Sequence, residues 1–133
     1  MLILALHENQ TPIVMTTQEI AQKLVAYCAK GEFEKAQTEL YAENAVSIEP
    51  YSTPNFAKET KGLPALLKKI KFFMDGLDAV HSIKVSEPLV VANAISFSMD
   101  MDVDMKGQGR MNMAEICVYE VKDGKVVSEQ FFF

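Results

Sequence analysis

The sequence predicts an α+β fold in which a curved antiparallel sheet has helices packed on one of its faces. Apolar residues recur at helical spacing in three segments before Gly76, whereas from Val80 onward apolar and polar residues mostly alternate with the period of a strand. Helices that precede a run of strands are typical of this class. The 133 residues suffice for one domain with its own core, and they contain no internal repeat and no low-complexity segment.

Capping residues and glycines bound the three helices. Thr16 with Glu19 three residues later makes a capping box, and a glycine follows the apolar stripe of the first and third helices. Pro64 suits the first turn of the third helix, because a proline at that position gives up no helical hydrogen bond. The helices are therefore expected between Thr16 and Gly31, from Glu32 to Tyr41, and between Gly62 and Gly76.

Strands are expected in the remaining apolar runs. The clearest is 95–105, in which apolar and polar residues alternate strictly. His81 falls on the apolar side of the alternating run that begins at Val80. The other expected strands are 45–48, 80–86, 89–91 and the two runs on either side of residues 122–124.

Two hairpin loops set the expected register of the C-terminal strands. Interpreted as a five-residue loop, residues 106–110 place Met101 opposite Glu115. Interpreted as a three-residue loop closed by a glycine with positive φ, residues 122–124 bring two carboxylates onto one largely apolar face. That face is expected to carry Glu115, Cys117, Tyr119, Val127, Glu129, Phe131 and Phe133.

Composition excludes several classes of partner. The net charge of -5, with no cluster of basic residues, disfavours nucleic acid. No apolar run approaches the length of a membrane span, so no membrane partner is expected. The two cysteines, Cys28 and Cys117, suit reduced and buried thiols in a cytoplasmic protein. Residues 1–14 precede the first clear element and could be an extension, an edge strand or a dimer arm.

The carboxylates on the apolar face need either partners or a cavity, because a buried polar group without a hydrogen bond is costly. We interpret the face as a cavity wall. Two alternatives stay open: each carboxylate has a structural hydrogen-bond partner, or a bulge turns Glu129 outward. Glu115 and Glu129 could share a proton and split their pKa values, as acid and base pairs do. Glu49, just before Pro50, is placed as a general base at a cavity mouth, or is a solvated loop carboxylate.

Other residues each have a functional and a structural interpretation. His81 could shuttle a proton or could be a satisfied core residue. The methionines between residues 99 and 113, among them Met99 and Met101, would form an adaptable wall for an apolar ligand, or simply core. The aspartates of 100–104 lack the glycine that a calcium loop requires, and the histidines and cysteines have no metal-ligand spacing. We expect no metal and no cofactor.

Four stretches taken together resemble a known family. Lys30–Glu34, Leu40–Pro50, the helix start at Gly62 and Val118–Val127 have the order and spacing of the nuclear transport factor 2-like superfamily. Within it, they resemble the SnoaL-like proteins related to polyketide cyclases and ketosteroid isomerases. The resemblance implies a cone-shaped, cystatin-like domain over residues 15–133, with the helices on the concave face of the sheet around a mostly apolar pocket, and residues 1–14 as an N-terminal extension.

The resemblance also implies roles for single residues. Glu49 matches the carboxylate base of the ketosteroid isomerases, and Glu115 and Cys117 match a polar pair of the polyketide cyclases. However, Leu24 stands where the isomerases carry an oxyanion-binding tyrosine, and Phe131 stands where the cyclases carry their acidic catalyst. Neither of these two reactions is therefore implied.

Two functions remain open from the sequence. The first is cofactor-free acid and base chemistry, such as isomerisation, cyclisation or dehydration, with Glu49, Glu115 and His81 as catalytic residues. The second is a non-catalytic ligand-binding or dimerisation module, whose pocket holds a hydrophobic metabolite or is merely packed. A small hydrophobic molecule in the pocket would contact Met99, Met101, Cys117, Glu129 and Phe131.

A homodimer is also expected, because the face opposite the pocket carries an apolar patch that a small acidic domain would not leave in water. The residues expected in this patch are Ala114, Ile116, Val118, Val126 and Phe132.

Overall fold

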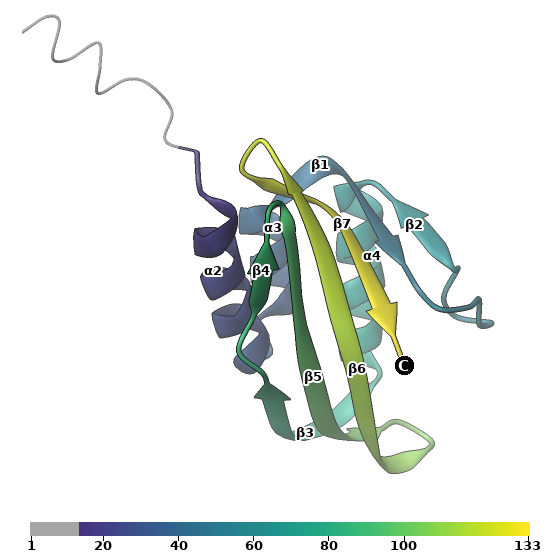
Figure 1. Cartoon of the computed structure of the whole chain (residues 1–133). Coiled ribbons are helices and arrows are strands. Elements are labelled where there is room, and N and C mark those ends of the chain that lie inside the picture. The colour runs from purple at the N-terminus through teal and green to yellow at the C-terminus, as the bar shows by residue number, and fades with distance from the viewer. Residues whose placement is uncertain (1–13) are drawn as a thin grey trace, which may run out of the picture.

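The structure is a computed structural model that describes residues 14–133, and it confirms the α+β fold class (Figure 1). Residues 1–13 of the expected N-terminal extension lie outside the described residues. The helices are α2 (Thr17–Ala29), α3 (Phe33–Leu40) and α4 (Leu63–Asp75). The strands are β1 (Tyr41–Ile48), β2 (Glu59–Lys61), β3 (Leu77–Val85), β4 (Leu89–Val91), β5 (Ala94–Met105), β6 (Gly109–Lys122) and β7 (Lys125–Phe132).

The strands form one curved sheet in the order β2-β1-β7-β6-β5-β3, and β4 pairs with β5. Every neighbouring pair is antiparallel except β1 and β7, which are parallel, so the sheet is mixed and not purely antiparallel. Most of the chain separates β1 from β7, and no hairpin therefore forces them into opposite directions. The three helices cover one face of this sheet (Figure 1).

The helix termini follow the expected signals. The Thr16 hydroxyl accepts a hydrogen bond from the backbone N–H of Glu19, and the Glu19 carboxylate accepts one from the backbone N–H of Thr16. Gly62 precedes α4, and Pro64 lies in its first turn. In the described residues, no helix is both long and apolar enough to cross a membrane.

The core lies between the helices and the concave face of the sheet. Helix α2 contributes its apolar stripe, and the alternating strand β5 contributes every second residue. Fully buried side chains include Ile20, Leu24, Leu40, Leu66, Ile95, Val103, Cys117 and Val126.

Both hairpin registers differ from the prediction. Met105 pairs with Gly109, so the loop between β5 and β6 has three residues and places Met99, not Met101, opposite Glu115. The difference is two residues, and each side chain therefore keeps its predicted face.

The C-terminal hairpin has a two-residue turn, Asp123–Gly124, in place of the predicted three-residue loop. Both turn residues have positive φ, 52° and 75°, which suits a type I′ turn. A register shift between Glu120 and Val121 then pairs Tyr119 with Glu129 on the inner face. Because of this bulge, Val126 is the valine of β7 that lies in the core, and the inward prediction for Val127 is wrong.

Candidate functional site

A cavity of about 240 Å³ lies between the helices and the concave face of the sheet. Met99, Met101 and Phe131 line it, as the alternation of the strands predicted. All three helices contribute further apolar side chains, such as Leu24, Phe33 and Phe73. Apolar ligands of modest size suit such a wall.

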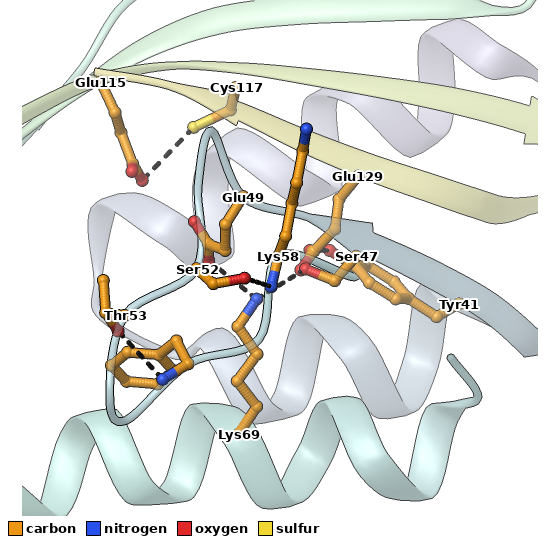
Figure 2. A network of polar contacts seen from close by, with 11 residues as sticks. Tyr41, Ser47, Glu49, Ser52, Thr53, Lys58, Lys69, Glu115, Cys117 and Glu129 are labelled. Carbon is orange, nitrogen blue, oxygen red and sulfur yellow. Dashed lines mark hydrogen bonds and ion pairs between the residues drawn. The ribbon is translucent and has the colours of Figure 1, made fainter. Parts of the chain in front are cut away.

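The polar side chains of the cavity centre on Lys69, which extends from α4 (Figure 2). Its ammonium lies 2.8 Å from Glu49 Oε1 and donates to Ser47 Oγ at 2.9 Å. The Lys69 and Glu49 side chains are only 15% and 16% exposed, so water screens this ion pair weakly. The Lys69 ammonium also lies 5.8 Å from the centre of the Phe131 ring, which is within cation–π range.

Glu129 lies at the buried end of the same network. The Ser47 hydroxyl donates to Glu129 Oε2 at 2.6 Å, and the Tyr41 hydroxyl donates to Oε1. Burial raises the pKa of Glu129, while these two hydrogen bonds and the nearby Lys69 counteract the rise. Burial beside Glu129 also raises the pKa of Tyr41 well above its ordinary value, so the phenol keeps the proton that it donates. Ser47 thus links the buried carboxylate to Lys69.

Glu115 points from β6 into the cavity, apart from this network (Figure 2). Among residues 14–133, its one hydrogen-bond contact is the Cys117 thiol, whose sulfur lies 3.7 Å from Oε1 and is a weak donor. Burial and the negative charge of Glu49 raise the pKa of Glu115 to about 7. At neutral pH the group can therefore either donate or accept a proton.

The sequence model of the SnoaL-like domain family matches residues 15–133. The chain belongs to the SnoaL-like domain family. No curated protein sequence matches this SnoaL-like domain significantly.

Several crystal structures are similar to this SnoaL-like domain. A candidate SnoaL-like polyketide cyclase from Mesorhizobium loti is 28% identical, with a TM-score of 0.82, over 90% of this chain and 100% of that one. A candidate isomerase from Bacillus subtilis is 25% identical, with a TM-score of 0.68, over 88% of each chain. A protein with a cystatin-like fold from Xanthomonas campestris, 14% identical with a TM-score of 0.75 over 89% and 90% of the two chains, shares the fold.

The two thiols are unsuited to nucleophilic chemistry. Burial is the main cause that raises the pKa of Cys28 to about 12, and it raises the pKa of Cys117 well above the ordinary value. Both cysteines are free and buried. Cys117 was predicted to touch a ligand, but its thiol contacts Glu115 and the residue is not among those that line the cavity.

The inward prediction for His81 is wrong. The pairing of β3 with β5 shifts register between Val80 and Ser82, and His81 is the residue left between them. Its Nε2 lies 2.9 Å from Asp104 Oδ1, and it does not line the cavity. Nearby, Arg110 contacts both carboxylate oxygens of Asp102. Among the described residues, no group of three or more histidine, cysteine or acidic side chains is arranged to hold a metal.

Sequence reasoning missed Lys69 and Ser47, which belong to the network. Lys69 lies three residues after Leu66 and four before Phe73, which places it on the inward stripe of α4. Ser47 lies near the end of β1, two residues before Glu49, and the period of a strand therefore predicts one face for both. The helical spacing and the strand alternation are therefore the sequence signals that identify these two polar residues as inward-facing.

Tyr41 and Gln37 were also missed. Gln37 follows Phe33 by four residues and lies on the inward side of α3, where it is buried. Tyr41 was assigned to the end of a helix, whereas the structure begins β1 there and directs the hydroxyl to Glu129.

Proposed function

We propose that this SnoaL-like domain binds a small, largely apolar molecule in its cavity and catalyses cofactor-free proton transfer on it. The observation that carries the proposal is Glu115, a carboxyl group on the cavity wall whose pKa is about 7. A general acid or base works best when its pKa lies near the working pH, because both protonation states are then populated.

Glu49 would be the second polar group that meets the substrate. It lines the cavity and is held in place by the ion pair with Lys69, so its carboxylate is oriented before a ligand arrives. Glu115 would then move a proton, while the Glu49–Lys69 pair would contact another part of the substrate. His81 has no part in this scheme.

Isomerisation, cyclisation and dehydration share this step, in which a proton leaves carbon or joins oxygen. Two similar structures belong to a candidate polyketide cyclase and a candidate isomerase, which supports the same reaction class here. The free, buried thiols suit the cytoplasmic location that we propose.

The test uses 2-tetralone, a small apolar ketone with exchangeable α-protons. Binding is measured from NMR shift changes in the backbone amides of β5 and β6, and catalysis from deuterium uptake at the α-carbons in D₂O. We expect binding at the cavity and a rate of uptake that Glu115→Gln lowers about a hundredfold. The matched control is Glu120→Gln, the same change on the same strand at an exposed position.

A non-catalytic binding module is the second candidate. Leu24 supports it, because this cavity-lining residue is apolar where the resemblance to the isomerases would require an oxyanion donor. Binding of 2-tetralone without deuterium uptake above the Glu115→Gln rate would favour this second candidate. Absence of binding would contradict both.

A further inference from the structure

The charged groups that line the cavity are mostly hydrogen-bond acceptors. Three carboxylates line it, those of Glu49, Glu115 and Glu129. Of the described residues that line the cavity, Lys69 alone is cationic. Its ammonium is already engaged by Glu49 at 2.8 Å and by Ser47 at 2.9 Å. The cavity therefore has acceptors left over.

Gln37 adds an acceptor on the helix wall. The residue is 6% exposed and lines the cavity, and its Oε1 has no hydrogen-bond partner among residues 14–133. Buried polar atoms nearly always have a partner in native structures, so an unmet acceptor on a cavity wall indicates a donor on the occupant.

Glu115 is the corresponding acceptor on the sheet wall. Its contact with the Cys117 thiol, at 3.7 Å, is too weak to compensate a carboxylate. Aromatic rings surround the same space, among them Phe33, Phe73 and Phe131. Ring faces attract cations, and an apolar space with aromatic walls and an unpaired carboxylate suits a cation better than an anion.

We infer that the ligand is a small apolar amine in its protonated form, whose ammonium pairs with the Glu115 carboxylate while one of its hydrogen-bond donors reaches the amide oxygen of Gln37. The inference rests on the proposed function, because it names the substrate class of the same cavity. An anionic ligand is disfavoured, since it would add to the negative charge already present.

The affinity for such an amine depends on pH through Glu115. The charged groups around this carboxyl are Glu49 just after β1, Glu129 on β7 and Lys69 on α4, and the Cys117 thiol lies beside it on β6. The two carboxylates favour its protonated form, and Lys69 opposes them. A bound ammonium favours the ionised form, so binding releases a proton and tightens as the pH rises through about 7.

The experiment compares three probes with one ring system. These are 2-aminotetralin, which is a cation, 2-tetralol, which is neutral, and tetralin-2-carboxylate, which is an anion. Calorimetric titration at about pH 8 should give the highest affinity for the amine, a lower one for the alcohol and the lowest for the carboxylate. The amine should bind at least about tenfold more tightly than the alcohol. Glu115→Gln should lower the affinity for the amine about tenfold and leave the affinity for the alcohol unchanged. Gln37→Met should also lower the affinity for the amine. Glu120→Gln is the control.

The outcomes separate this inference from the proposed function. The inference is wrong if the alcohol or the carboxylate binds as tightly as the amine, or if Glu115→Gln lowers the affinity for all bound probes equally. Either result would still agree with the proposal that the cavity binds a small apolar molecule. If none of the three probes binds, both are wrong.

Discussion

Glu115 ties the stability of the protein to pH at the scale of a single residue. Its pKa rises from the ordinary 4.5 to about 7 in the folded state, so between these values the folded chain holds this proton more firmly than the unfolded chain does. The free energy of unfolding therefore falls as the pH climbs through this window, by up to about 3 kcal/mol. Above the window the loss is complete and stays constant.

Glu115→Gln should remove this dependence because the amide does not titrate. We expect the variant to match the wild type near the ordinary carboxyl pKa and to exceed its stability by up to about 3 kcal/mol near pH 8. Urea unfolding across this range measures the difference, with Glu120→Gln as the control at an exposed site on the same strand. Parallel curves for the variant and the wild type would show that Glu115 titrates normally.

Tyr41→Phe tests the buried end of the network. The change removes one of the two hydroxyl donors of Glu129, and the buried carboxylate loses part of its compensation. We expect a loss of about 1–3 kcal/mol in the free energy of unfolding, larger above the pKa of Glu129 than below it. Tyr27→Phe is the matched control, because Tyr27 donates to Glu39, which is more exposed. Equal effects of the two changes would refute a special role for Tyr41.

At this scale, alternation was enough to find the carboxylates but not their partners. Glu115 and Glu129 were placed inward correctly, since period-two patterns survive a change of register by two residues. His81 was misplaced because the extra residue in β3 reverses the face, and no residue type marks that bulge in the sequence. The hydrogen bonds of Glu129 join residues more than eighty positions apart, which periodicity cannot reveal.

At the scale of elements, the Asp123–Gly124 turn sets the register of the C-terminal hairpin. Gly124 has a φ of 75°, and a Cβ built there would lie 2.2 Å from Val14 Cγ1. Gly107 has a similar φ of 77°, but a Cβ there would meet no atom within 4 Å. Alanine at Gly107 therefore tests backbone strain alone, whereas alanine at Gly124 tests backbone strain together with a steric clash.

Gly107→Ala should lower the free energy of unfolding by about 1–2 kcal/mol, which is the usual cost of a left-handed backbone conformation in a residue with a side chain. Gly124→Ala should lower the free energy of unfolding by this amount and by at least about 1 kcal/mol more, because the new methyl group must displace Val14. Thermal unfolding of both variants measures the difference. If the two variants lose the same stability, the contact between Val14 and the turn does not contribute.

The bounds of the elements followed from capping residues and glycines, whereas the details of pairing did not. Thr16, Gly31 and Gly62 mark helix ends by local hydrogen bonds and backbone freedom. The bulge at Val127 and the parallel pairing of β1 with β7 depend on how the strands meet in the sheet. Local sequence contains little information about either.

At the scale of the whole molecule, the sheet face opposite the cavity carries a patch made of Ala114, Ile116, Val118 and Phe132. Ile116 and Phe132 are 53% and 48% exposed. Val126, which the sequence also suggested for this patch, lies in the core. We propose that the patch joins two copies of the chain, because exposed contiguous apolar area on a small domain favours association.

Ile116→Asp should dissociate such a homodimer, since it places a charge in the apolar contact. Light scattering at micromolar concentration should show a dimer for the wild type and a monomer for the variant. Phe72→Asp is the control, because Phe72 is 56% exposed and lies on α4, which packs on the other face of the sheet (Figure 1). A monomeric wild type would refute the interface.

The overall arrangement was the most predictable level, because order and periodicity of the elements restrict the ways in which helices and sheet can pack. The resemblance of Leu40–Pro50 and Val118–Val127 to SnoaL-like proteins agreed with the family match. The size of the cavity was not predictable, since it depends on how far α4 stands from the sheet.

The edge-to-face contact between Tyr51 and Phe133 has a practical consequence. Both rings line the cavity and are among its most exposed residues, so they mark its opening. Any polypeptide that continues beyond Phe133 must leave the domain beside this opening. An affinity tag fused after Phe133 would compete with ligands for the entrance, and purification handles belong at the opposite terminus.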